Sequence, residues 1–135
     1  IRTGGFKHRG RIPPLHAIRP WASRVHACPA IDRSERSFAL ASDLNPGTAW
    51  CGNMQFCIAL ACRAMQLTPA EAVVAATLNA AAAIRKADQI GSLEPGKQAD
   101  LIVLSVNDYR HLAYQFGTNL VSQVVKAGQF YPPLE

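Results

Sequence analysis

The character of the sequence changes at about residue 38, and this change limits regular folding to the residues that follow. The preceding segment, 1–37, is interrupted by four prolines, each of which also restricts the residue before it: Pro13, Pro14, Pro20 and Pro29. No helical or strand pattern of apolar residues persists there for more than a few positions. We therefore expect residues 1–37 to be an irregular basic segment and the fold to begin near Phe38.

The positive charge of the chain belongs to the same segment. Residues 1–37 hold eight Lys and Arg against two acidic residues, whereas the remainder holds six basic and seven acidic residues. A basic arm for nucleic acid is one interpretation, but Phe6 and Trp21 are the only aromatic residues interleaved with these charges. We expect no nucleic-acid partner, and interpret the segment as poorly ordered or as foreign to the ancestral reading frame.

Composition places the chain among globular proteins, with 49% hydrophobic and 17% charged residues. No run approaches the roughly 20 apolar residues of a membrane span. No apolar run with a small-residue cleavage site follows the first basic residues, so we expect no secretory signal. We therefore expect a cytoplasmic protein without a membrane partner. The cysteine spacing forms no CxxC pair, which favours buried free thiols at all four positions: Cys28, Cys51, Cys57 and Cys62.

From residue 38 onward, apolar patterns and turn residues predict regular elements in a definite order. A capping box starts one helix, with Thr68 as N-cap, Pro69 at the first helical position and Glu71 reaching back to the free amide. Strand, turn and helices in this order suit the closing unit of a (β/α) barrel, and the later strands suit a small β-domain beside it. The expected elements are a strand over 38–42, a turn over 45–48, a helix over 53–65, a helix from 68 to about 84, a turn with a short strand over 88–98, a strand over 100–104, a loop over 108–119 and a strand over 121–130 broken at Gly128.

Asp43 is the first candidate for chemistry, because it directly follows the expected buried strand. Barrel enzymes place their active sites at that end of their strands. A carboxylate there can bind a divalent metal and accept a proton from the water that the metal activates. Position alone favours the alternative, in which Asp43 is an ordinary turn residue that opens a loop.

Three motifs support the catalytic interpretation. The segment 41–48, Ala-Ser-Asp-Leu-Asn-Pro-Gly-Thr, resembles the ligand-bearing turn of imidazolonepropionases in the amidohydrolase superfamily. The segment 91–101 resembles a signature of the wider superfamily, and the segment 108–119 is similar to imidazolonepropionases in particular. The resemblance covers about residues 38–130.

This resemblance implies an α/β fold. The chain would be the C-terminal fragment of a metal-dependent (β/α)8 TIM-barrel hydrolase, contributing its last strand and helices, with part of a small β-sandwich domain. The implied division assigns 38–87 to the end of the barrel and 88–135 to the small domain, after the non-matching segment 1–37.

The resemblance also implies the roles of four residues in hydrolysis. The aspartate matching Asp43 binds the catalytic metal, zinc or iron, and is thought to move the proton; Asn45, Gly47 and Thr48 match residues that contact the substrate. The implied reaction converts 4-imidazolone-5-propanoate and water to N-formimidoyl-L-glutamate in histidine degradation. The partner is thus a small-molecule substrate, and a homodimer is one expectation for the intact enzyme.

The remaining family pattern has no counterpart in this sequence. The HxH pair, the further catalytic histidines, a glutamate and the substrate-binding arginine and tyrosine are not matched, and none of these roles is assigned to His8, His16 or His26. One carboxylate cannot hold a catalytic zinc, and one or two strands cannot close a barrel. We therefore expect the isolated chain to be weakly folded or aggregation-prone, and inactive.

Two alternatives stay open. The superfamily signature at 91–101 also fits a related amidohydrolase, such as one that deaminates a purine or pterin. A non-enzymatic fragment with a basic arm is the other alternative, and it predicts salt-sensitive nucleic-acid binding that depends on residues 1–37.

Overall fold

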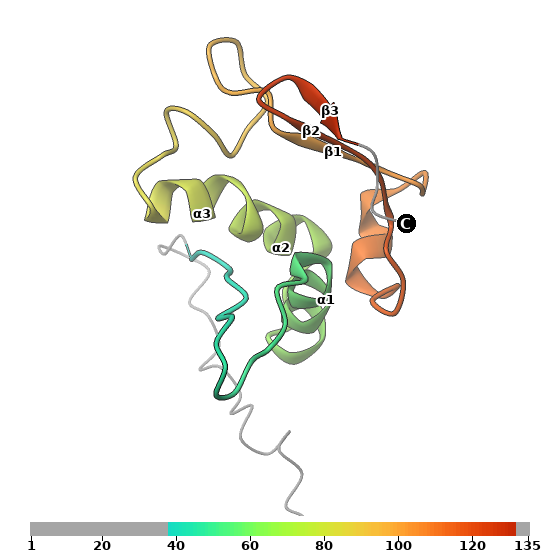
Figure 1. Cartoon of the computed structure of the whole chain (residues 1–135). Helices are drawn as coiled ribbons and strands as arrows, with labels where there is room; N and C mark the ends of the chain where they lie inside the picture. The colour runs from blue at the N-terminus through green and yellow to red at the C-terminus, as the bar shows by residue number, and fades with distance from the viewer. Residues whose placement is uncertain (1–37, 132–135) are drawn as a thin grey trace, which may run out of the picture.

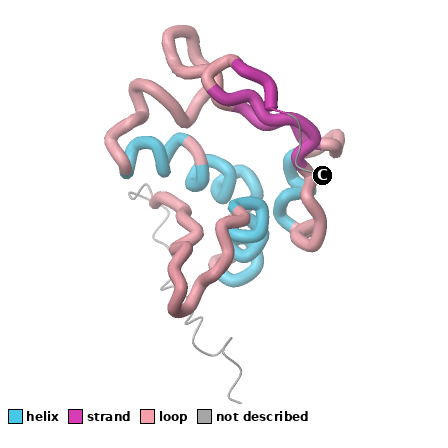
Figure 2. The backbone as a smooth tube through the Cα atoms, in the orientation of Figure 1, coloured by secondary structure: helices cyan, strands magenta, loops and turns pink. Residues whose placement is uncertain are grey.

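The structure is a computed structural model that describes residues 38–131, so the expectations for 1–37 lie outside the described residues. Three helices lie together, and a three-stranded sheet lies to one side of them (Figure 1). A long loop carries the chain from the helices to the sheet (Figure 2). The elements in order are α1 (Met54–Ala64), α2 (Pro69–Ala76), α3 (Leu78–Ala83), β1 (Leu101–Leu104), the 3-10 helix η3 (Tyr109–Ala113), β2 (Val121–Lys126) and β3 (Gln129–Tyr131).

The segment 38–42 is not a strand, contrary to the sequence prediction. Its backbone bonds to helices instead: the Leu40 amide donates to the Ala75 oxygen at 2.9 Å, and the Asn79 side chain donates to the Phe38 oxygen at 3.0 Å. An apolar run becomes a strand only where a neighbouring strand pairs with its backbone. Among the described residues no strand lies beside this segment.

Helix α1 confirms the helix predicted over 53–65. It begins after Asn53, whose side-chain oxygen accepts from the amides of Gln55 at 3.0 Å and Phe56 at 3.4 Å. This cap satisfies two of the amides that a helix leaves unpaired at its start. The cap therefore defines where α1 begins, a few residues after the turn at 45–48.

The capping box is present, but the helix that it starts is shorter than predicted. The Thr68 amide donates to the Glu71 carboxylate at 2.7 Å, and the Glu71 amide donates to the Thr68 hydroxyl at 3.3 Å. The predicted single helix is broken at Thr77, whose φ of −122° and ψ of −87° are not helical. The Thr77 hydroxyl donates to the Val73 oxygen at 2.7 Å, a bond that competes with the backbone ladder.

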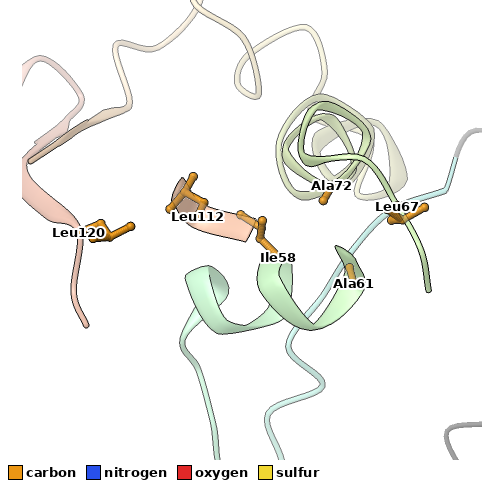
Figure 3. Packing of buried hydrophobic residues seen from close by; sticks show 6 residues of the cluster. All are labelled: Ile58, Ala61, Leu67, Ala72, Leu112 and Leu120. Atoms are coloured by element: carbon orange, nitrogen blue, oxygen red, sulfur yellow. The ribbon is translucent and has the colours of Figure 1, made fainter. Parts of the chain in front are cut away.

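The core joins the helices to the C-terminal part of the chain. Figure 3 shows Leu112 of η3 next to Ile58 of α1 on one side and Leu120 on the other. Ala61 and Ala72 let α1 and α2 approach closely, and η3 contacts both helices. Half of the buried hydrophobic residues are alanines, so the core removes little apolar area from water: Ile58, Ala59, Ala61, Leu67, Ala72, Ala75, Ala81, Leu112, Leu120 and Val125.

The sheet has the antiparallel order β1-β2-β3. The break predicted at Gly128 is confirmed, because β2 and β3 are joined through Ala127 and Gly128, with φ of 52° and 78°. Two consecutive left-handed residues are the signature of a type I′ hairpin. Asp100 holds this hairpin to β1, since its carboxylate accepts from the Ala127 amide at 2.8 Å and from the Lys126 ammonium.

The stretches on either side of β1 differ from prediction. Residues 88–98 form turns without the expected short strand. Gly91, with φ of 96°, passes so close to α3 that an added Cβ would lie 2.6 Å from the Ala81 Cβ. Within the loop predicted over 108–119, the side chain of Asp108 caps the 3-10 helix η3 by accepting from the Arg110 amide at 2.9 Å.

Candidate functional site

The turn that follows residue 43 is built around the side chain of Asn45. Its oxygen accepts from the amides of Gly47 at 2.9 Å and Thr48 at 2.8 Å, and its nitrogen donates to the Asp43 backbone oxygen at 2.7 Å. The Asn45 amide also donates to the Ala49 oxygen at 3.0 Å, which closes the turn. Short polar side chains that bond their own backbone favour such turns.

Asp43 carries the free functional group of this turn. Its side chain is exposed, and within the described residues its carboxylate makes a single long contact, 3.5 Å from the Asn45 side-chain nitrogen. Its φ of 51° lies in the left-handed region, which aspartate tolerates better than most residues. The carboxylate is therefore available to a metal ion, a substrate or a proton, while its backbone is held by the turn.

The four residues predicted for the site thus lie in one turn, but their surroundings differ. Gly47 and Thr48 are exposed like Asp43, whereas Asn45 is half-buried. A Cβ at Gly47 would lie 3.2 Å from the Asn45 side-chain oxygen, so a larger residue would crowd the bond that shapes the turn. The Asn45 side-chain amide bonds within the turn itself. The exposed surface of the turn is formed by the other three residues, Asp43, Gly47 and Thr48.

A metal site is not completed by residues 38–131, where no group of three His, Cys, Asp or Glu side chains could hold an ion. A catalytic zinc normally has three protein ligands. His111 lies in η3, away from the turn in sequence, and its ring nitrogen is 3.0 Å from the Tyr114 hydroxyl. Asp43 fits as one metal ligand, and the other ligands would come from outside the described residues.

Two apolar side chains beside the turn are exposed to solvent. Trp50 is 80% exposed, and Leu44 is 58% exposed. The signal that was available is position, since both residues flank the polar turn.

A sequence model described as "Amidohydrolase family" matches residues 23–130. The chain belongs to the amidohydrolase family. The match begins upstream of Phe38, where the resemblance based on motifs begins, so family-like sequence extends into the basic segment.

Curated relatives of this amidohydrolase chain share a name. An imidazolonepropionase of Herpetosiphon aurantiacus is 55% identical over 91 residues, which is 67% of this chain and 21% of the relative. The imidazolonepropionase of Bacteroides fragilis is 50% identical over 94 residues, 70% of this chain and 22% of the relative. That of Chloroflexus aggregans is 40% identical over 116 residues, 86% of this chain and 27% of the relative.

The amidohydrolase chain therefore spans about a quarter or less of the length that its relatives have. The structure contains an α/β arrangement of helices and one three-stranded sheet. Within residues 38–131, no helix has the length and apolar character to cross a membrane.

Proposed function

We propose that this chain supplies part of the active site of a hydrolase that converts 4-imidazolone-5-propanoate and water to N-formimidoyl-L-glutamate. The observation that carries the proposal is the 55% identity over 91 residues to a relative named imidazolonepropionase. The turn at 43–48 adds a physical reason, because it presents an exposed carboxylate on a fixed backbone. A cytoplasmic location and a homodimer remain predictions of the resemblance.

In this proposal the residues of the turn have different roles in the reaction. Asp43 accepts or donates the proton at its exposed carboxylate, a role that needs a side chain within reach of the reacting group. Gly47 and the Thr48 hydroxyl contact the polar ring of the substrate or its carboxylate tail. Asn45 is also proposed to contact the substrate, and its amide holds the turn together through bonds to Asp43, Gly47 and Thr48.

The proposed cofactor is a divalent metal, zinc or iron, with Asp43 as one of its ligands. When bound, such a metal lowers the pKa of water and polarises a carbonyl group. The carboxylate of Asp43 is suited to this position because it is exposed and is held by a single 3.5 Å contact among the described residues.

We further propose that residues 38–87 are the end of a (β/α)8 barrel and that 88–135 are part of a small β-sandwich domain. The order of elements within residues 38–131 supports this division: the α-helices α1, α2 and α3 precede residue 88, and the strands β1, β2 and β3 follow it. The missing pairing of 38–42 also fits, since a last barrel strand would pair with strands that the described residues do not contain.

A chimera provides the test of the proposed function. The 91 matching residues of the Herpetosiphon relative are replaced by those of this chain, and hydrolysis of 4-imidazolone-5-propanoate is followed beside the unaltered relative. Guanine and a pterin serve as competing substrates. We expect the chimera to retain on the order of a tenth or more of the kcat/KM of the relative, and to act on the imidazolone alone.

A folded chimera that turns over guanine or a pterin but not the imidazolone would assign the segment to a different amidohydrolase. A folded chimera inactive on every ring would contradict the proposal that these residues build an active site.

A further inference from the structure

We propose that Gln55 and Asn119 form a positioning clamp that fixes the start of α1, and through it the turn at 43–48, relative to the three-stranded sheet. The catalytic part of this inference rests on the proposed function. The structural part concerns only hydrogen bonds between segments more than sixty residues apart in the chain.

The clamp is a closed set of amide hydrogen bonds. The Gln55 side-chain nitrogen donates to the Asn119 side-chain oxygen at 2.9 Å, and the Gln55 side-chain oxygen accepts from the Leu120 amide at 2.9 Å. The same Asn119 oxygen accepts from the Val121 amide at 3.0 Å. Both the oxygen and the nitrogen of the Gln55 side-chain amide therefore bond to the residues that lead into β2.

Burial makes this arrangement costly to lose. Leu120 is 5% exposed and belongs to the core cluster, so its amide has little access to water. A buried amide that loses its acceptor costs free energy comparable to its desolvation. Phe56, the residue after Gln55, packs edge to face on Phe116 with ring centroids 6.4 Å apart. This apolar contact joins the same two segments as the clamp.

The clamp acts at a point where few other contacts join helices to sheet. Helices α1 and α2 contact η3, while the strands contact mainly one another. The first turn of α1 is thus tied to the beginning of β2 by side-chain amides, and its own amides are capped by Asn53.

The start of α1 is in turn close to the candidate site. Four residues, 50–53, separate the end of the turn at Ala49 from Met54. A Cβ at Gly52 would lie 3.7 Å from the Leu44 side chain, so this connection lies against the turn that it leaves. A shift of the first turn of α1 would therefore move the backbone that carries Asp43, and displacements of about 1 Å cost about a hundredfold in rate.

Substitutions of the two amides give a pattern specific to the clamp. Asn119→Asp keeps an acceptor for both the Gln55 side chain and the Val121 amide, so it should leave the free energy of unfolding nearly unchanged. Gln55→Glu keeps the acceptor for Leu120 but turns a second oxygen toward the Asn119 oxygen. The double variant Gln55→Glu/Asn119→Asp places two carboxylates face to face. It should therefore lower the free energy of unfolding more than either single change does.

Kinetics in the chimera test the catalytic part. We expect Gln55→Leu to lower kcat roughly tenfold or more, while KM changes by less than about twofold. Gln123→Leu and Gln123→Glu are matched controls, because Gln123 is exposed in β2 and makes no side-chain hydrogen bond within the described residues. An unchanged kcat in folded Gln55→Leu, or equal effects at Gln123, would overturn this role.

Hydrogen exchange on the folded chimera tests the structural part without any measurement of activity. We expect slow exchange at the Leu120 amide, loss of that protection in Gln55→Leu, and retained protection at Val125 in the middle of the sheet. An unprotected Leu120 amide in the parent chimera, or equal protection of that amide in Gln55→Leu, would overturn the clamp. If the clamp is confirmed while the parent chimera is inactive, the proposed function fails and the structural inference stands.

Discussion

Asn45 and Gly91 show how single residues define this molecule. Asn45 satisfies the backbone of the site turn with its own side chain, and Gly91 lets the loop after α3 pass against that helix. The first role follows from the sequence, because asparagine two residues before glycine is typical of a turn. The second could not be predicted, since the close approach depends on how α3 and the loop meet in space.

Gly91→Ala is expected to destabilise the chain by about 2 kcal/mol or more, because the new Cβ would clash with Ala81 and the Thr77 oxygen at a left-handed φ. Gly96→Ala is the matched control, since Gly96 has a similar φ of 93° but no atom within 4 Å of the added Cβ. Urea unfolding measures both variants. Equal losses of stability would show that backbone conformation alone, and not packing on α3, requires glycine at 91.

At the scale of elements, the sequence predicts those with local signals and fails where partners decide. The helices at 53–65 and after Thr68 have caps that the sequence displays, and the structure confirms both starts. The prediction of a strand at 38–42 is wrong, because a strand needs a neighbouring strand to pair with and the described residues offer none to this segment. The sequence does not predict the break at Thr77, because an alanine-rich run favours an unbroken helix. The hydrogen bond from the Thr77 hydroxyl to the Val73 oxygen is visible only in the structure.

The β2–β3 hairpin is tied to β1 by Asp100, and this connection should make stability depend on pH. The Lys126 ammonium, the Ala127 amide and the Gln98 side chain lower the pKa of Asp100 from 3.8 to about 2. A carboxyl with a lower pKa in the folded state stabilises fully above its unfolded pKa, near 3.8, and loses that contribution as pH falls through about 2.

Asp100→Asn should therefore destabilise the chain at pH 7, and the difference from the parent should shrink as the pH approaches 2. Urea unfolding at several pH values measures this difference. Asp88→Asn is the control, because Asp88 is exposed and makes no side-chain hydrogen bond within residues 38–131. A difference that stays constant from pH 7 to pH 2 would contradict the assigned role of the carboxylate.

At the scale of the whole molecule, the motifs at 41–48, 91–101 and 108–119 led to the amidohydrolase family, which the family match confirms. The sequence also placed Asp43, Asn45, Gly47 and Thr48 in one turn, since neighbours in a chain need no long-range information to meet. It did not reveal that Gln55 reaches Asn119 across the molecule. The roles of the four turn residues in catalysis stay predictions.

The central claim is that the carboxylate of Asp43 takes part in hydrolysis. The most direct measurement is the kcat/KM of the active chimera and its Asp43→Asn variant on 4-imidazolone-5-propanoate, with circular dichroism to confirm equal folding. Because asparagine keeps the shape of the side chain but cannot accept the proton, we predict a loss of about a hundredfold or more. Full turnover by a folded Asp43→Asn variant would contradict the account.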